Sequence, residues 1–312
     1  MKIVFLDSNT VGDVDLSPIK ELGDYTSYEY TADDEVVDNC KGADIVISNK
    51  VYLGKEVMDK LPELKLICVA ATGTNNVDLD YAAKKNILVK NVAAYSSMSV
   101  VQHTFALLFS MMHSVGDYDS YIKSNDYSNS NSFTCMNYSY DELSALTWGI
   151  VGLGDIGRNV AKLASAFGAN VIYYSTSGKN SNPDYKSVSF DELLLNSDII
   201  SIHAPLNDNT YDLFKYDSFK KMKKSAIIVN VGRGGIINEV DLAKALVDNQ
   251  IKGAALDVFE KEPIPLENPL LAVEDKKKLI LTPHIAWASV QARERLIKGI
   301  CNNISQFYKS NI

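Results

Sequence analysis

The chain has 312 residues, which is more than one compact hydrophobic core usually holds, so we expect two domains. Apolar residues make up 46% and charged residues 22% of the sequence, an ordinary balance for a globular protein. The net charge of −8 argues against nucleic acid or an anionic membrane as a partner, because no basic field would attract phosphates.

The N-terminal segment and the cysteines indicate a cytoplasmic protein. MKIVFLD is apolar over too few residues for a secretory signal, and no window approaches the roughly 20 apolar residues of a membrane span. Four cysteines, Cys40, Cys68, Cys135 and Cys301, lack CxxC spacing, which favours reduced thiols and argues against a metal site. We therefore expect no metal and no membrane partner.

Short apolar runs alternate with helix-like stretches along the whole sequence, as in βαβ units that build parallel sheets. The first series of predicted strands covers 2–7, 43–49, 64–70 and 87–92, with helical patterns such as 55–61 and 80–86 between them. The second series covers 147–154, 169–175, 197–205, 225–234, 252–259 and 278–284. The pattern predicts an α/β fold with two doubly wound parallel-sheet domains.

Three further segments organise the sequence. Residues 99–115 are apolar on nearly all sides, which predicts a buried helix connecting the two domains. Residues 116–141 are rich in Ser, Asn, Asp and Tyr and are typical of an exposed loop or an arm that reaches a partner subunit. Residues 288–308 have the periodicity of an amphipathic helix that packs back on the first domain, which would make that domain discontinuous.

A glycine-rich turn carries the cofactor prediction. GLGDIG follows a predicted strand directly and precedes a predicted helix, the context that the GxGxxG dinucleotide fingerprint requires. Gly152 allows the tight turn, Gly154 lets the backbone approach a pyrophosphate, and Gly157 lets helix and strand pack closely. The alternative is a glycine-rich turn without a ligand. The predicted contacts here are Gly152, Gly154, Asp155, Ile156 and Gly157.

The end of the next predicted strand leaves the type of dinucleotide open. NAD-binding sites usually have an acidic residue there for the ribose hydroxyls, but this protein has Ser175 and Thr176, followed by Lys179. A carboxylate would repel a 2′-phosphate and a serine would not, yet no arginine is present to hold that phosphate. Both NAD and NADP therefore remain possible cofactors, with Ser175 and Thr176 as contacts.

Several segments together resemble the D-isomer-specific 2-hydroxyacid dehydrogenase family over nearly the whole sequence. The matching segments are 71–79, 91–96, 101–108, 152–158, 203–206, 230–235, 255–263 and 282–287. Within the family, 91–108 and 284–289 are most similar to the glycerate dehydrogenase (hydroxypyruvate reductase) branch.

The resemblance implies a flavodoxin-like substrate domain and a Rossmann-type dinucleotide-binding domain. We expect the substrate domain at 1–97 plus 287–312 and the NAD(P)-binding domain at 98–286. Family members are usually homodimers formed largely through the cofactor domains, so we expect a homodimer here.

Three polar residues follow predicted strands of the second series, at the sheet edge where open α/β sheets bind ligands. Imidazole titrates near neutrality, so His284 suits proton transfer, and a carboxylate beside it, Glu262, would favour the protonated ring and fix its orientation. The guanidinium of Arg233 can hold a substrate carboxylate through paired hydrogen bonds. The alternatives are that His284 is a loop histidine, that Glu262 is a solvated loop acid, and that Arg233 forms a surface salt bridge.

The resemblance adds further site residues. Backbone N–H groups of Thr72 and Gly73 would cradle the substrate carboxylate, Thr72 would touch the cofactor, and Asp257 would receive the nicotinamide carboxamide. The alternative for Asp257 is a strand-end acid satisfied by backbone. The remaining cofactor contacts that we predict are His203, Ala204, Pro205, Val231, Gly232, Arg233 and His284.

Tyr95 and Trp287 are candidates for the wall around the substrate, with core packing as the alternative, and Lys50 is a candidate cation near the substrate or a solvated lysine. His203 is alternatively a cap on its turn.

Together these residues predict an NAD(P)-dependent oxidoreductase that interconverts a small D-2-hydroxy acid and its 2-oxo acid, with D-glycerate and hydroxypyruvate as the leading pair. The alternatives are a D-2-hydroxyacid dehydrogenase that acts on D-lactate or on longer acids, and a dinucleotide-sensing binding protein of corepressor type.

Overall fold

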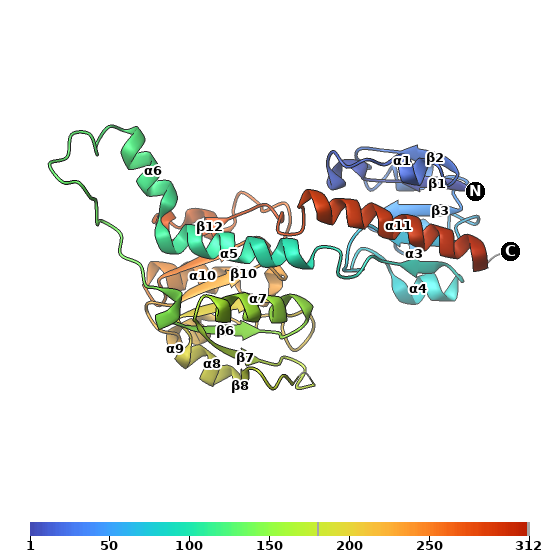
Figure 1. Cartoon of the computed structure of the whole chain (residues 1–312). Helices are drawn as coiled ribbons and strands as arrows, with labels where there is room; N and C mark the ends of the chain where they lie inside the picture. The colour runs from blue at the N-terminus through green and yellow to red at the C-terminus, as the bar shows by residue number, and fades with distance from the viewer. Residues whose placement is uncertain (180, 311–312) are drawn as a thin grey trace. The chain divides into compact units, whose positions relative to one another are not determined.

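The computed structural model describes residues 1–179 and 181–310 (Figure 1). The protein consists of two compact units. Unit 1 comprises Met1–Ser96 and Ala288–Ile312, and unit 2 comprises Ser97–Trp287.

Unit 1 is built on a five-stranded parallel sheet in the order β2-β1-β3-β4-β5, the flavodoxin-like order. All residues of β3 and β4 are buried, as expected of inner parallel strands with both faces covered. The strands are β1 (Lys2–Phe5), β2 (Asp24–Ser27), β3 (Ile45–Ser48), β4 (Leu66–Val69) and β5 (Leu88–Lys90).

The longest helix of unit 1 comes from the far end of the sequence. α11 (Val290–Ser310) packs against β4 and α1 and buries an apolar stripe that includes Leu296, Ile300 and Ile304, while its exposed residues are mostly polar. The shorter helices are η1 (Ser8–Val11), α1 (Ser17–Lys20), α2 (Val36–Asn39), α3 (Lys55–Met58) and α4 (Leu79–Lys84).

Unit 2 is built on a seven-stranded parallel sheet in the order β12-β11-β10-β9-β6-β7-β8. The backbone enters at β6, proceeds outward through β7 and β8, and then returns to the other side of β6 through β9, so the topological switch point lies between β6 and β9. The strands are β6 (Thr147–Val151), β7 (Asn170–Tyr174), β8 (Lys186–Ser187), β9 (Ile199–Ile202), β10 (Ile227–Asn230), β11 (Gly253–Leu256) and β12 (Leu279–Leu281).

Helices cover both faces of this sheet and create two cores. Ile150 belongs to the core beneath α5 (Ser97–His113) and α7 (Asp155–Ala166), whereas its neighbour Val151 belongs to the core beneath α8, α9 and α10. This alternation follows from the two-residue period of a strand. The other helices are α6 (Val115–Lys123), η2 (Leu143–Ala145), α8 (Phe190–Asn196), α9 (Tyr216–Lys221), η3 (Gly234–Ile236), α10 (Glu239–Val247), η4 (Pro269–Ala272) and η5 (Lys276–Lys278).

The two all-parallel sheets confirm the predicted α/β fold class. Two short edge strands, β2 and β8, were not predicted. Their side chains are half-buried or exposed, and they pair through backbone atoms alone, so they lack the apolar run that marks the inner strands.

The polar segment 116–141 was predicted to be an exposed loop or an arm that reaches a partner subunit. A loop is wrong for its first part, which is helical, and the arm stays a prediction. α6 is helical through Lys123, although it buries no residue, and the segment that follows it is irregular. Figure 1 shows α6 and this segment extending away from the sheet of unit 2.

Two features are absent from the described residues. No helix among them has the length and apolarity needed to cross a bilayer. They also contain no group of three or more His, Cys, Asp or Glu side chains arranged to hold a metal ion.

Candidate active site

Three adjacent parallel strands bring together the polar residues of the candidate site. β10, β11 and β12 lie side by side in unit 2, so their carboxyl ends meet at one edge of the sheet. Arg233 follows β10, Glu262 follows β11, and His284 follows β12. Residues that are 51 positions apart in sequence, 233 to 284, therefore belong to one sheet edge.

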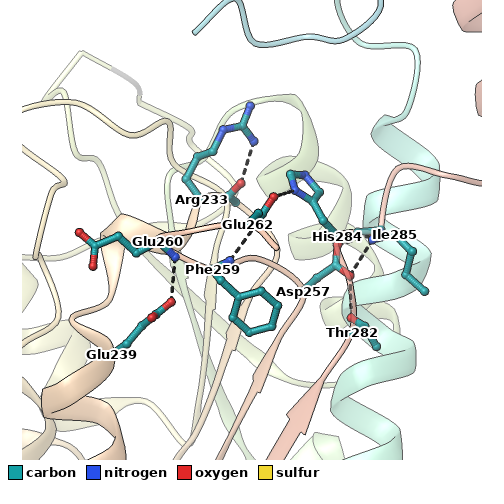
Figure 2. A network of polar contacts seen from close by, with 11 residues as sticks. Arg233, Glu239, Asp257, Phe259, Glu260, Glu262, Thr282, His284 and Ile285 are labelled. Carbon is teal, nitrogen blue, oxygen red and sulfur yellow. Dashed lines mark hydrogen bonds and ion pairs between the residues drawn. The ribbon is translucent and has the colours of Figure 1, made fainter. Parts of the chain in front are cut away.

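His284 and Glu262 form a short polar contact in the site (Figure 2). Nδ1 of His284 lies 2.6 Å from Oε2 of Glu262, and the two side chains are only 24% and 27% exposed. Oε1 of Glu262 accepts a hydrogen bond of 3.0 Å from the backbone N–H of Phe259, which orients the carboxylate. The carboxylate holds Nδ1, so Nε2 is the ring nitrogen available for exchanging a proton with a ligand.

The backbone around Arg233 is fixed by its neighbours. The side-chain amide of Asn230 donates to the carbonyl of Arg233 at 2.9 Å, and Nη1 of Arg233 donates to the carbonyl of Gly232 at 2.8 Å. A Cβ atom on Gly234 would lie 1.8 Å from the carbonyl carbon of Phe259. Only glycine allows this approach, and it packs the arginine turn directly onto the segment that carries Glu262.

Asp257 organises the turn on which His284 sits. Its carboxylate is fully buried and accepts hydrogen bonds from the Thr282 hydroxyl at 2.6 Å and from the backbone N–H groups of Ile285 and Ala286 at 2.9 and 2.8 Å. Burial raises the pKa of Asp257, but hydrogen bonds from His103, Thr282 and the backbone outweigh it and hold the pKa below its usual value. Asp257 thus makes the backbone contacts expected of a strand-end acid with a structural role. Its side chain has no exposed surface in this structure.

The glycine-rich turn has the geometry that its sequence predicts. Gly152 has a φ of +88°, and a Cβ atom there would lie 2.8 Å from the backbone nitrogen of Ala204. A Cβ atom on Gly157 would lie 2.2 Å from the carbonyl oxygen of Gly152. By contrast, a Cβ atom on Gly154 would project into open space, so the backbone at the start of α7 is accessible to an anion.

Two polar atoms beside this turn are buried without a hydrogen-bond partner among the described residues: Nδ1 of His203 and Oγ of Ser175. Ser201 Oγ accepts a hydrogen bond from Trp148 Nε1 at 2.8 Å and lies 2.9 Å from Nε2 of His203. Burial lowers the pKa of His203 to about 3, so the ring is neutral, and its Nδ1 stays without a partner among the described residues.

The residues present therefore fit a dinucleotide. His203, Ser175 and the glycine turn all lie at the carboxyl ends of β9, β7 and β6, at the topological switch point where such sheets bind ligands. The site combines an accessible helix N-terminus for phosphates with two unsatisfied polar atoms. Other predicted cofactor contacts in unit 2 have mixed exposure: Ala204 and Val231 are buried, Thr176 and Gly232 are half-buried, and Pro205 is exposed.

Four predicted substrate residues belong to unit 1. Lys50 is exposed, and its backbone N–H donates to the buried carboxylate of Asp7 at 2.6 Å. Thr72 is exposed and Gly73 half-buried in the turn after β4, where the carbonyl of Thr72 accepts a hydrogen bond from the Asn91 side chain at 2.6 Å. Tyr95 is only 7% exposed, as core packing requires. In unit 2, Trp287 is half-buried against the core beneath α5 and α7.

Two residues of this region were not predicted as site residues. His103 lies on α5, and its Nε2 is 3.1 Å from Thr282 Oγ1 and 3.5 Å from Asp257 Oδ1. Glu239 is a buried acid at the start of α10 that binds the segment around Glu262. Neither has a local sequence signal beyond its place on a helix, because both act on residues distant in the sequence.

Comparisons with known proteins identify relatives of this chain. Residues 105–286 match the family model described as "D-isomer specific 2-hydroxyacid dehydrogenase, NAD binding domain". A hydroxypyruvate reductase of Blautia hydrogenotrophica is 37% identical over 100% of this chain and 98% of its own length. A glycerate dehydrogenase of Methylorubrum extorquens is 35% identical over 98% of this chain and 96% of its own length.

Solved structures of similar fold include enzymes with either nicotinamide dinucleotide. An acyclic imino acid reductase in complex with NADPH and D-Arg superposes with a TM-score of 0.88 at 29% identity and covers 99% of this chain and 98% of that one. A D-lactate dehydrogenase from Aquifex aeolicus, in complex with NAD and lactic acid, superposes with a TM-score of 0.84 at 28% identity and covers 99% and 96%.

Proposed function

The chain belongs to the D-isomer specific 2-hydroxyacid dehydrogenase family, and from this premise we propose that it reduces hydroxypyruvate to D-glycerate. As a family member it is an oxidoreductase of the EC 1.1.1 type that interconverts D-2-hydroxy acids and 2-oxo acids with a nicotinamide dinucleotide. The observation that supports these residues as the catalytic ones is the 2.6 Å contact between His284 and Glu262, beside the turn of Arg233.

Each residue of the site has one task in the proposed reaction. When bound at the glycine turn, a reduced nicotinamide dinucleotide would supply the hydride for the carbonyl carbon of the 2-oxo acid. Nε2 of His284 donates a proton to the carbonyl oxygen, and Glu262 holds the ring through Nδ1 and stabilises its positive charge before transfer. Arg233 offers a planar guanidinium to the substrate carboxylate. In the reverse direction, His284 takes the hydroxyl proton.

Kinetics on a substrate panel test this proposal. The purified protein is assayed with NADH and NADPH against hydroxypyruvate, glyoxylate, pyruvate and longer 2-oxo acids, and kcat/KM is compared. Hydroxypyruvate is expected to have the highest kcat/KM, and His284→Ala is expected to lose about 10²- to 10⁴-fold in kcat while cofactor affinity is retained. A higher kcat/KM for pyruvate or a longer acid would replace glycerate with D-lactate or a longer hydroxy acid. Cofactor binding without turnover of any 2-oxo acid would favour a dinucleotide-sensing binding protein.

The cofactor prediction extends to both dinucleotides. We propose that the protein accepts NADPH as well as NADH, because β7 ends at Tyr174 and is followed by Ser175 and Thr176 rather than an acid. The hydroxyl of Ser175 has no hydrogen-bond partner within 1–179 and 181–310. This supports the proposal, since the hydroxyl can donate to a ribose hydroxyl or to a 2′-phosphate.

The remaining assignments concern the whole molecule. We propose that unit 1 is the substrate domain and that unit 2 is the NAD(P)-binding domain, with Thr72, Gly73, Tyr95, Trp287 and Lys50 as substrate contacts. We further propose a cytoplasmic homodimer. The four free cysteines of the chain support the cytoplasmic location. The dimer is supported by the segment that begins with α6, because its apolar side chains Phe133 and Met136 are 92% and 84% exposed and could be covered by a partner subunit. Light scattering with the segment 124–136 deleted tests the dimer.

A further inference from the structure

The loop that carries Glu262 is anchored by a buried acid from another helix. Glu239, at the start of α10, is only 8% exposed. Its Oε1 accepts a hydrogen bond of 2.8 Å from the backbone N–H of Glu260, and its Oε2 accepts one of 2.6 Å from Nδ2 of Asn268. Both oxygens of one carboxylate are therefore used to hold the two ends of the segment 260–268, which contains Glu262. Figure 2 shows Glu239 beneath Glu260 in this network.

A purely local role at the helix start does not explain these contacts. Acids in a first helical turn commonly interact with the helix dipole or cap free N–H groups. In α10, however, Asn238 already supplies the cap, since its side chain accepts a hydrogen bond of 3.1 Å from the N–H of Asp241. Glu239 instead directs both oxygens at residues 21 and 29 positions further along the sequence.

The anchored loop leads directly to the proton-transferring pair. Glu260 lies between Phe259, whose N–H holds Oε1 of Glu262, and Glu262 itself, whose Oε2 lies 2.6 Å from His284. On its other side the Phe259–Glu260 peptide packs against Gly234, next to Arg233. A shift of this peptide would therefore misalign Glu262 with His284, and misplacements of about 1 Å in a catalytic geometry can cost about 10²-fold in rate.

Building on the proposed function, we propose that Glu239 is a positioning residue of the active site. It holds the loop 260–268 so that Glu262 meets His284 at hydrogen-bonding distance, and it touches neither substrate nor cofactor. The expected consequence of its loss is a fall in kcat with little change in the KM for the cofactor, because the glycine turn follows β6, whereas this loop follows β11, and β10 and β9 lie between these two strands in the sheet.

Matched variants test this role. Glu239→Ala removes both contacts, and Glu239→Gln keeps an oxygen that can accept from the Glu260 N–H. Asp241→Asn is the control, since it neutralises an acid in the same helical turn whose carboxylate holds the N–H of Tyr216 instead. We expect Glu239→Ala to lose about tenfold or more in kcat, Glu239→Gln to stay within about threefold of wild type, and Asp241→Asn to match wild type.

Proton NMR provides a readout that does not depend on turnover. The proton shared by His284 Nδ1 and Glu262 gives a low-field resonance at low temperature, assigned by its loss in His284→Gln. We expect this resonance to be lost or shifted upfield in Glu239→Ala and retained in Asp241→Asn. If no 2-oxo acid is turned over, the proposed function fails, yet the resonance still tests the positioning.

A folded Glu239→Ala protein that keeps the low-field resonance would overturn the proposal. If the wild-type protein is active, this contrary result also requires that the variant keeps the wild-type kcat. An equal loss in Asp241→Asn would also overturn the proposal. Thermal unfolding of each variant identifies misfolded protein. If Glu239→Ala does not fold, Glu239→Asp replaces it, because its shorter side chain keeps the charge but cannot reach both Glu260 and Asn268. The same losses are then expected, and a wild-type resonance in Glu239→Asp would refute the role.

Discussion

Nδ1 of His284 and Oε2 of Glu262 are 2.6 Å apart, although the two residues follow different strands and are separated by 22 positions in the sequence. Each partner is fixed independently: Glu262 by the N–H of Phe259, and the His284 turn by the buried carboxylate of Asp257, which holds Ile285 and Ala286. The imidazole is therefore held on one side by a rigid acceptor, which leaves its other nitrogen for the substrate.

Replacing Glu262 with glutamine removes the charge that stabilises a protonated ring while keeping the size of the side chain. We expect kcat for 2-oxo acid reduction to fall by about 10- to 100-fold at pH 7, because proton donation by a positioned group contributes about 10²- to 10⁴-fold. Glu260→Gln is the matched control, since that exposed carboxylate accepts a hydrogen bond from the Tyr211 hydroxyl and lies two residues away. Equal activity of the two variants in steady-state assays would contradict the role of Glu262.

Asp257→Asn is expected to destabilise the fold by about 2 to 3 kcal/mol at neutral pH, since three donors lose a charged acceptor. Because the folded-state pKa of Asp257 is lowered, its stabilisation is present above the ordinary value near pH 4 and is lost as pH falls through the folded-state pKa. Urea unfolding from pH 7 to pH 3 measures this difference. It should shrink below about pH 4, whereas the exposed-site variant Asp208→Asn should match wild type throughout.

His203 is expected to make the fold sensitive to mild acid. Its pKa is lowered to about 3 by burial, so the unfolded protein binds a proton below its ordinary pKa of about 6.5 while the folded protein remains unprotonated there. Stability is then lost as pH falls, by at most about 1.4 kcal/mol per pH unit. His203→Asn should flatten the unfolding free energy between pH 6 and pH 4. His113→Asn, which alters a ring that packs against Tyr140 at an interplanar angle of 48°, should retain the wild-type slope.

Ser175→Asp introduces the acid that the end of β7 lacks. A carboxylate there repels a 2′-phosphate and accepts hydrogen bonds from ribose hydroxyls, so the ratio of kcat/KM for NADPH over NADH should fall by about tenfold or more. Ser132→Asp adds the same charge at an exposed position of the segment after α6 and should leave the ratio unchanged. An unchanged ratio in Ser175→Asp would place the adenosine ribose elsewhere.

Much of the fold could be predicted because the inner strands are continuous apolar runs, and parallel strands buried on both faces have that signature. β10, whose four residues are all buried, was predicted for this reason. β2 and β8 were missed, because an edge strand held by backbone hydrogen bonds needs no apolar side chains. α6 was missed because most of it lies in a segment rich in Ser, Asn, Asp and Tyr, and it buries no residue.

The sequence by itself determined the local structural motifs of this protein. The glycine turn at 152–157 requires backbone conformations and close approaches that only glycine allows, so its spacing is visible without a structure. The tertiary structure alone decided which polar groups meet. That Glu239 holds Glu260, and that Asp257 holds Ile285, depends on packing between elements far apart in the sequence, and such contacts leave no periodicity in it. Buried acids of this kind look like ordinary helix-start or strand-end residues until the partners that satisfy them are seen.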